Sequence, residues 1–379
     1  MLHDLPLELT DRIIDYLSDD HASLRSCSLT SHAWLPRSRF HLFSTMHVEE
    51  NERLGSLVDV SYSNGAPPLD LVRSLTFKGI YWNPPWTGRL ADIFGNSSSS
   101  LQAFIAQQTE SRYAGILVST LRQFRNVTRL DLSGCTFRNL EMFRDIISAF
   151  PLLRRLCLQC VLMWDRVSPS DDEVGSDYPL SRPWTSCPPL THISLVSRMR
   201  SMWSVYQYIV STTSPQSVRS LELAVPRLGL DYAGSSIKAV APHLERLKVE
   251  PEEEFILAEW RLLNLNNCSA LRTFSMANTG GVPLAEILRF LSPCCRVRTL
   301  DLRLHALEER WEDLREVVTS EQFSELREVT MTLGDVYESP GSSIQCVNEF
   351  AEFLERRGVR TAVVGRESRF LRSSNTLGI

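Results

Sequence analysis

Side chains that could carry out chemistry are thinly spread along this chain of 379 residues. Cys157 and Cys160 form a C-x-x-C pair, a spacing that can hold zinc, but no second cysteine pair or cluster of histidines lies near them in the sequence. Packing within a strand is therefore the favoured interpretation. The sequence also lacks G-x-S-x-G, H-E-x-x-H, a phosphate-binding Gly-Lys-Ser/Thr loop and a Gly-rich dinucleotide fingerprint. We therefore expect no catalytic residues, no metal, no cofactor and no enzymatic activity.

Polar residues at regular positions indicate non-covalent recognition instead. An apolar pattern, L-x-x-L-x-L, recurs along the chain, and in a strand the residue between the last two apolar positions points to the opposite face. The residues at this position include Glu222, Lys248, Asp301 and Thr330, and Arg303 lies two places after Asp301. We expect these five residues to lie on one face and to bind a protein.

A second regular position directly follows the first apolar residue of each copy. It is arginine at Arg73, Arg154, Arg219, Arg272, Arg298, Arg327 and Arg360. These arginines would lie where strands begin. The favoured interpretation is a solvated row neutralised by acids such as Glu222, Asp301 and Glu328, and the alternative is a positively charged ridge along one rim.

The apolar pattern itself predicts the fold. Its ten copies begin at Val72, Val127, Leu153, Leu190, Val218, Leu244, Leu271, Val297, Leu326 and, more faintly, Val359. Most starts lie 26–29 residues apart, which is typical of leucine-rich repeats, in which each unit adds one strand and one helix. No unit can bury its own apolar face, so the units must stack. A doubly wound α/β sheet is less favoured, because it would not be expected to repeat this pattern so often.

The intervals between copies contain helical patterns over 141–150, 283–291 and 347–357, each followed by proline or glycine. The long first gap has room for an irregular unit, an aromatic loop at 81–89 and a helical segment from Leu101, and 164–189 is an acidic, proline-containing insertion. We therefore expect an α/β fold: an irregular solenoid over 72–365, with a curved parallel sheet inside and helices outside, and a tail at 366–379.

A separate helical module is predicted at residues 2–47. Asp4 can cap a helix, Pro6 suits its first turn, and Leu5, Leu9, Ile13 and Leu17 recur every four residues. A second apolar series contains Leu24, Cys27, Leu29 and Trp34. Helices this small cannot bury so much apolar surface, so the module needs a partner. A connecting helix and linker would occupy 48–71.

The same residues resemble a known motif. Leu5-Pro6-x-Glu8-Leu9, followed by Leu24-x-x-Cys27-Ser28-Leu29-x-Ser31-x-x-Trp34, resembles the F-box, and residues 35–43 continue as in fungal F-box proteins. Thr30 departs from the pattern, where an apolar valine is usual. The resemblance implies that the module binds the Skp-type adaptor of a cullin–RING ubiquitin ligase of the SCF type. It assigns that contact to Leu5, Pro6, Leu9, Ile13, Leu17, Leu24, Cys27, Leu29 and Trp34.

The resemblance further implies that the chain is a substrate receptor, whose repeat domain captures an unknown protein substrate. The alternative is a leucine-rich-repeat binding scaffold whose helical N-terminus only caps the solenoid. A net charge of −5 and a pI near 6.0 give no general attraction to nucleic acid or to a membrane surface. Nine scattered cysteines and acidic residues from Asp4 onward favour an intracellular protein without a leader, in the cytoplasm, the nucleus or both.

Overall fold

The computed structural model describes residues 6–49, 69–79, 100–111, 114–163, 188–196, 209, 215–278, 282–304, 311–333 and 340–365. The chain forms two compact units. The first comprises Met1–Leu156 and Val161–Pro188, and the second comprises Cys157–Cys160 and Pro189–Ile379. The division falls inside the repeat array and not at the predicted junction after residue 47, because the N-terminal helices pack with the first strands.

The first unit begins with three short helices, α1 (Leu7–Tyr16), α2 (His21–Thr30) and α3 (Leu35–Ser44). Pro6 occupies the N-cap position of α1, so the helix starts later than the predicted cap at Asp4, which lies outside the described residues. Asp20 caps α2 by accepting hydrogen bonds from the backbone N–H groups of Ala22 and Ser23. The helical module ends at Ser44 and not at residue 47, because the chain enters a strand at Thr45.

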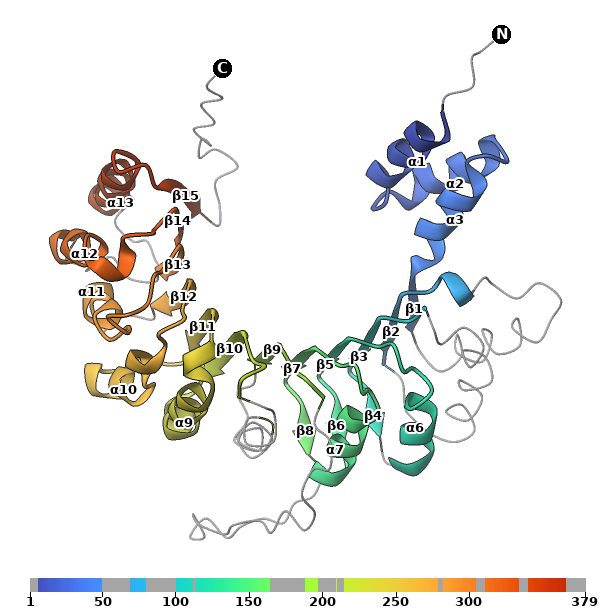
Figure 1. Cartoon of the computed structure of the whole chain (residues 1–379), viewed down its shortest axis with the longest axis horizontal. Coiled ribbons are helices and arrows are strands. Elements are labelled where there is room, and N and C mark those ends of the chain that lie inside the picture. Colours follow the sequence, from blue (N-terminus) through green and yellow to red (C-terminus); the bar gives the residue numbers. More distant parts are fainter. Residues whose placement is uncertain are drawn as a thin grey trace. The chain divides into compact units, whose positions relative to one another are not determined.

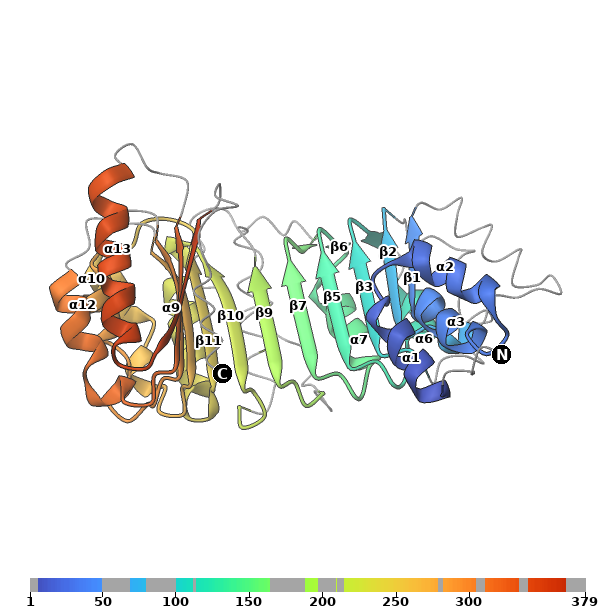
Figure 2. The same ribbon diagram turned by 90° about the horizontal axis from the view of Figure 1, so that it is seen from above.

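Four strands of the first unit, and a fifth that the division between the units cuts after Leu156, follow one another in the sheet in chain order (Figure 2). They are β1 (Thr45–Glu49), β2 (Ser74–Lys78), β3 (Ala103–Gln107), β5 (Arg129–Ser133) and β7 (Arg155–Gln159). The ladders joining β1, β2, β3 and β5 are parallel. A smaller sheet contains β4 (Glu110–Ser111), β6 (Thr136–Phe137) and β8 (Leu162–Met163), and the unit also holds η1 (Leu69–Leu71), α6 (Ala114–Leu121) and α7 (Leu140–Ser148).

Two strands of the larger sheet in this unit were not predicted, and neither were the three short strands of the smaller sheet. The solenoid sheet starts at β1 and not at Val72, and the segment from Leu101, which was predicted to be helical, contains β3. Phe104 and Ala106 are both buried and lie two residues apart, which is the period of a strand. In the long gap between the first two copies, β3 is the extra unit.

The second unit carries seven strands in chain order. They are β9 (His192–Val196), β10 (Ser220–Val225), β11 (Arg246–Pro251), β12 (Thr273–Asn278), β13 (Thr299–Leu304), β14 (Glu328–Leu333) and β15 (Arg360–Gly365), and every ladder between them is parallel. The helices of this unit line one face of its sheet (Figure 1). They are α9 (Leu230–Val240), α10 (Leu257–Leu262), α11 (Leu284–Leu288), α12 (Trp311–Val318) and α13 (Pro340–Glu355), with 3₁₀ turns η2 (Arg227–Gly229), η3 (Ala241–His243), η4 (Leu265–Asn267) and η5 (Glu321–Phe323).

Apolar residues of the repeated pattern lie opposite one another in the core of this unit. Leu221 pairs with Leu247, Leu247 with Phe274, and Phe274 with Leu300, and all four are buried. Each strand therefore completes the apolar layer of its neighbour, as stacked repeats require. This arrangement confirms the predicted α/β fold, a leucine-rich-repeat solenoid of parallel strands backed by helices.

The tenth copy of the pattern is out of phase by one residue. Thr361 lies opposite Val329, which places Ala362 opposite Thr330 and Val364 on the exposed face. The predicted copy of the pattern, which began at Val359, assigned Ala362 and Val364 to the core. That assignment was wrong. A shift of one residue exchanges the two faces of a strand, and Val363 takes the inward position instead.

Several predicted segments lie outside the described residues: the aromatic loop at 81–89, nearly all of the insertion at 164–189, most of the linker at 48–71 and the tail at 366–379. Within the described part of the chain, no helix combines the length and apolar character needed to cross a bilayer.

Candidate protein-interaction surfaces

The three N-terminal helices divide their apolar residues between a small core and an exposed face. Ile14 and Leu24 are buried, whereas Leu7, Leu9, Ile13 and Tyr16 of α1 are exposed. Leu9, Ile13 and Tyr16 follow a spacing of four and then three residues, which places them on one side of the helix. One face of α1 thus presents apolar side chains to solvent.

The predicted adaptor-binding residues occupy different environments. Pro6, Leu9, Ile13 and Leu29 are exposed, Leu29 to 88%; Leu17, Cys27 and Trp34 are half-buried; Leu24 belongs to the core; Leu5 lies outside the described residues. Leu24 therefore supports the module from within and does not present a surface. Sequence reasoning missed Tyr16, which is 79% exposed, although its distance of three residues from Ile13 is the signal that could have found it.

An ion pair fixes α1 against α3. Asp15 accepts two hydrogen bonds from Arg37, at 2.5 Å from Nε and 2.7 Å from Nη2, and its Oδ1 lies 2.7 Å from Nε2 of His41. The Arg37 guanidinium, followed by His41, lowers the pKa of Asp15 from 3.8 to about 2. This two-point attachment orients the exposed face of α1 relative to α3.

Contacts at the end of α3 attach the module to the sheet of the same unit. Two guanidinium groups lie over the ring of Phe40: that of Arg37 is 5.1 Å from the ring centroid and that of Arg73 is 5.0 Å from it. The backbone N–H of Arg73 donates to the carbonyl of Ser44 at 2.8 Å. α3 therefore caps the first strands, and the apolar face of α1 is left for another partner.

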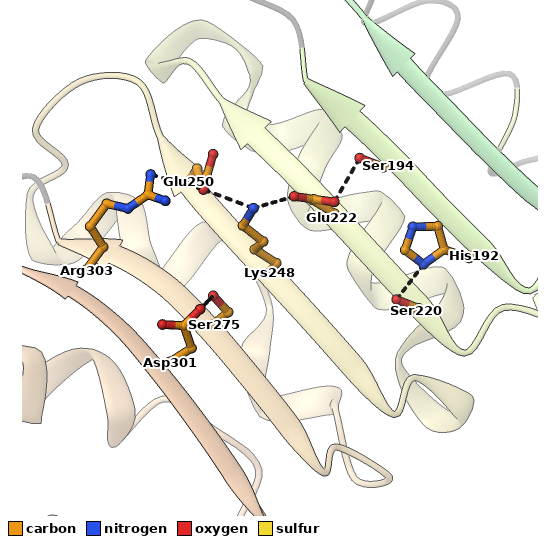
Figure 3. A network of polar contacts seen from close by, with 9 residues as sticks. All are labelled: His192, Ser194, Ser220, Glu222, Lys248, Glu250, Ser275, Asp301 and Arg303. Carbon is orange, nitrogen blue, oxygen red and sulfur yellow. Dashed lines mark hydrogen bonds and ion pairs between the residues drawn. The ribbon is translucent and has the colours of Figure 1, made fainter. Parts of the chain in front are cut away.

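A polar network covers the helix-free face of the sheet in the second unit (Figure 3). Glu222 accepts a hydrogen bond from Ser194 at 2.9 Å and forms an ion pair with Lys248, which also contacts Glu250 at 3.1 Å. Glu250 in turn lies 3.4 Å from Arg303. Consecutive parallel strands bring these residues into register, because Glu222 lies opposite both Ser194 and Lys248.

The remaining predicted residues extend this polar network. Asp301 accepts a hydrogen bond from Ser275 at 3.0 Å and lies opposite Thr330 in the ladder. The structure therefore brings Glu222, Lys248, Asp301, Arg303 and Thr330 onto one face, as the pattern predicted. Sequence reasoning did not include Glu250, although it stands two residues after Lys248 on the same strand and thus on the same face.

Burial and ion pairing shift the pKa values of the two central charged residues of this network, Glu222 and Lys248, in opposite directions. Burial tends to raise the pKa of Glu222, but the Lys248 ammonium group and the Ser194 hydroxyl outweigh it and hold that pKa below its ordinary value. Burial tends to lower the pKa of Lys248, but hydrogen bonds to Glu222 and Glu250 raise it on balance. Both residues are therefore charged at neutral pH, and their charges largely compensate one another.

No protein-family model and no curated protein matches the chain. Among solved structures, it is similar to a chain of the Rad7 and Elc1 complex in yeast, with 11% identity and a TM-score of 0.45, covering 97% of this chain and 91% of that one. It is also similar to internalin C2 from Listeria monocytogenes str. 4b F2365, with 12% identity and a TM-score of 0.32, covering 73% of this chain and 91% of that one. At these scores neither likeness assigns a function to the chain.

Proposed function

We propose that this chain is the substrate-recognition subunit of an SCF-type cullin–RING ubiquitin ligase, with the N-terminal module binding the Skp-type adaptor. The observation that carries the proposal is the exposed apolar face of α1, formed by Leu9, Ile13 and Tyr16. It coincides with the segment whose sequence resembles the F-box. An apolar face rimmed by polar residues marks a protein-interaction site.

The apolar face of α1 can contribute to binding. Full burial of a leucine or isoleucine side chain contributes about 1.5–3 kcal/mol, and Leu9 and Ile13, which are 47% and 44% exposed, would supply part of that energy toward the entropic cost of association. The Asp15–Arg37 ion pair holds α1 in place before binding. The adaptor would therefore meet a surface that is already ordered.

The repeat array would capture the protein substrate. The polar face around Glu222, Lys248, Asp301, Arg303 and Thr330 offers charged and hydroxyl groups from consecutive strands. In this proposal the chain performs no chemistry itself. It raises the local concentration of substrate lysines near the ubiquitin carrier held by other subunits, which reduces the entropic cost of transfer. The protein would act in the cytoplasm, the nucleus or both.

Adaptor binding by the purified full chain tests the proposal. The double variant Leu9→Asp/Ile13→Asp should lose retention of a purified Skp-type adaptor, because two charges would be buried at the contact. Leu228→Asp is the matched control, because Leu228 is also exposed but lies in η2 of the second unit. Equal retention by the folded double variant and the wild type would contradict the proposal.

A second candidate is a leucine-rich-repeat binding scaffold that is not attached to a ligase. It is favoured by the continuity of α3 with β1 and by the packing of Arg73 on Phe40, since a helical cap would need both. The same experiment separates the two candidates. A folded wild-type chain that retains no Skp-type adaptor would favour the scaffold.

A further inference from the structure

Three arginines form a row where strands β12, β13 and β14 of the second unit begin. The backbone N–H of Arg298 donates to the carbonyl of Arg272 at 2.7 Å, and that of Arg327 donates to the carbonyl of Arg298 at 2.9 Å. Neighbouring strands lie about 4.8 Å apart, so the three side chains leave the backbone at that spacing. Arg272 and Arg327 are exposed and Arg298 is half-exposed.

Among the described residues, the carboxylate of Glu325 is the one that forms an ion pair with this row. Nη2 of Arg298 lies 2.7 Å from Oε2 of Glu325. The hydrogen bond from Arg298 is the main cause that lowers the pKa of Glu325, and the charges of Arg272 and Arg327 add to it. Within the described part of the chain, neither Arg272 nor Arg327 has a carboxylate oxygen within 4.0 Å.

Of the acids that were expected to neutralise the arginines, two are engaged elsewhere and one, Glu328, does meet an arginine of the predicted set. Glu222 pairs with Lys248, Asp301 accepts from Ser275, and Glu328 lies 3.8 Å from Arg360. The backbone N–H of Arg360 donates to the carbonyl of Arg327 at 2.9 Å, but the shifted register of β15 places Arg360 opposite Glu328, with which its guanidinium pairs.

Glu245 lies next to the row but pairs with another arginine: its Oε1 lies 3.8 Å from Nε of Arg219. Its backbone carbonyl accepts a hydrogen bond from the N–H of Arg272, which sets Glu245 beside Arg272 without an ion pair between the two side chains. The three arginines therefore carry two positive charges in excess of Glu325.

We propose that Arg272, Arg298 and Arg327 bind a phosphoryl group carried on an extended segment of a protein partner. A phosphorylated side chain supplies close to two negative charges and three acceptor oxygens. Arginine forks form paired, charge-assisted hydrogen bonds with such oxygens. Glu325 occupies Arg298 in the unbound chain and moves aside when the phosphoryl group binds. The inference concerns the repeat array alone and does not require adaptor binding.

The test uses the purified full chain and a fluorescein-labelled peptide of Gly, Ser and Ala with one central phosphothreonine. The same peptide with unmodified threonine is the reference. We expect fluorescence anisotropy at low ionic strength to give at least about tenfold tighter binding of the phosphopeptide, the effect of gaining charge-assisted hydrogen bonds. Arg272→Ala/Arg327→Ala should remove this preference. Arg356→Ala is the matched control, because Arg356 is exposed, directly follows α13 and contacts only Glu352 among the acids described.

The variant Glu325→Gln tests whether the three arginines bind a phosphoryl group or only stabilise the fold. Removing this carboxylate should strengthen phosphopeptide binding several-fold, because it frees Arg298, whereas a structural role would give weaker or unchanged binding. This variant also keeps the proposal testable if the double arginine variant does not fold. The proposal is wrong if both peptides bind equally, if Glu325→Gln does not strengthen binding, if inorganic phosphate competes mole for mole, or if a single-stranded DNA oligonucleotide binds as tightly.

Discussion

The guanidinium of Arg73 lies 5.0 Å from the ring centroid of Phe40 and thereby joins the start of β2 to α3. Arg73 stands 33 positions after Phe40 in the sequence, and most of the intervening residues lie outside the described part of the chain. The contact belongs to the first unit. This contact attaches the helical module to the first strands of the sheet.

A double-mutant cycle on Phe40→Ala and Arg73→Ala should therefore show coupling. We expect an interaction free energy of about 0.5–1 kcal/mol, which is typical of a cation–π pair near a surface. Urea denaturation followed by circular dichroism measures it. Lys78→Ala, at the other end of β2, provides the control with Phe40→Ala, and additive effects are expected there. Additivity in the Arg73 cycle would contradict the prediction.

The Asp15 carboxylate should make the stability of the helical module dependent on pH. Its pKa is lowered from 3.8 to about 2 in the folded chain, so its stabilising contribution is complete above the ordinary value and is lost as the pH falls towards 2. Asp15 is 40% exposed, so solvent screening limits the effect to below about 1 kcal/mol.

The difference in urea midpoint between wild type and Asp15→Asn, measured from pH 7 down to pH 2, checks this prediction. It should be constant near neutral pH and shrink as the medium becomes acidic. Asp19→Asn is the control, because Asp19 is exposed and has no ion pair within the described residues. A difference that stays constant to the lowest pH would count against the assigned role.

The shifted register of β15 predicts opposite sensitivities at two adjacent valines. Val363→Asp should cost about 1–2 kcal/mol more than Val364→Asp, because Val363 lies opposite Met331 on the inward face and Val364 is 48% exposed. Leu300→Asp, in the centre of the core, should cost at least about 3 kcal/mol. Urea unfolding of the three variants measures these costs, and a larger loss for Val364→Asp would restore the phase inferred from the sequence.

The cysteines should differ sharply in reactivity. Burial, with a smaller contribution from Cys295, raises the pKa of Cys268 to about 12, and burial raises that of Cys295 to about 11. Because the thiolate is the reactive form, both should resist alkylation in the native protein. Cys160 and Cys294 are exposed and should react first. Mass-spectrometric mapping after brief N-ethylmaleimide treatment at pH 8 tests this order, and early labelling of Cys268 would contradict the packing.

The sequence by itself determined the repeat and its alignment for nine copies. Leucines that must be buried recur at fixed intervals, so Leu221, Leu247 and Leu300 could be assigned to one apolar layer before any coordinates were known. The same alternation placed Glu222, Lys248 and Asp301 on one face. Local periodicity is sufficient here because parallel strands of a stacked array pair with their neighbours in chain order.

Tertiary structure alone decided the features that depend on pairing across the sheet. β3 has a short apolar pattern that also fits a helix, and its parallel pairing with β2 and β5 shows that it is a strand. The phase of β15 is fixed by its ladder with β14, because its own small residues do not distinguish one face from the other. Which acids meet the row of arginines likewise depends on side chains from different loops and strands. Ion pairs such as Arg298–Glu325 join residues that have no periodic relation in the sequence, so no pattern could reveal them.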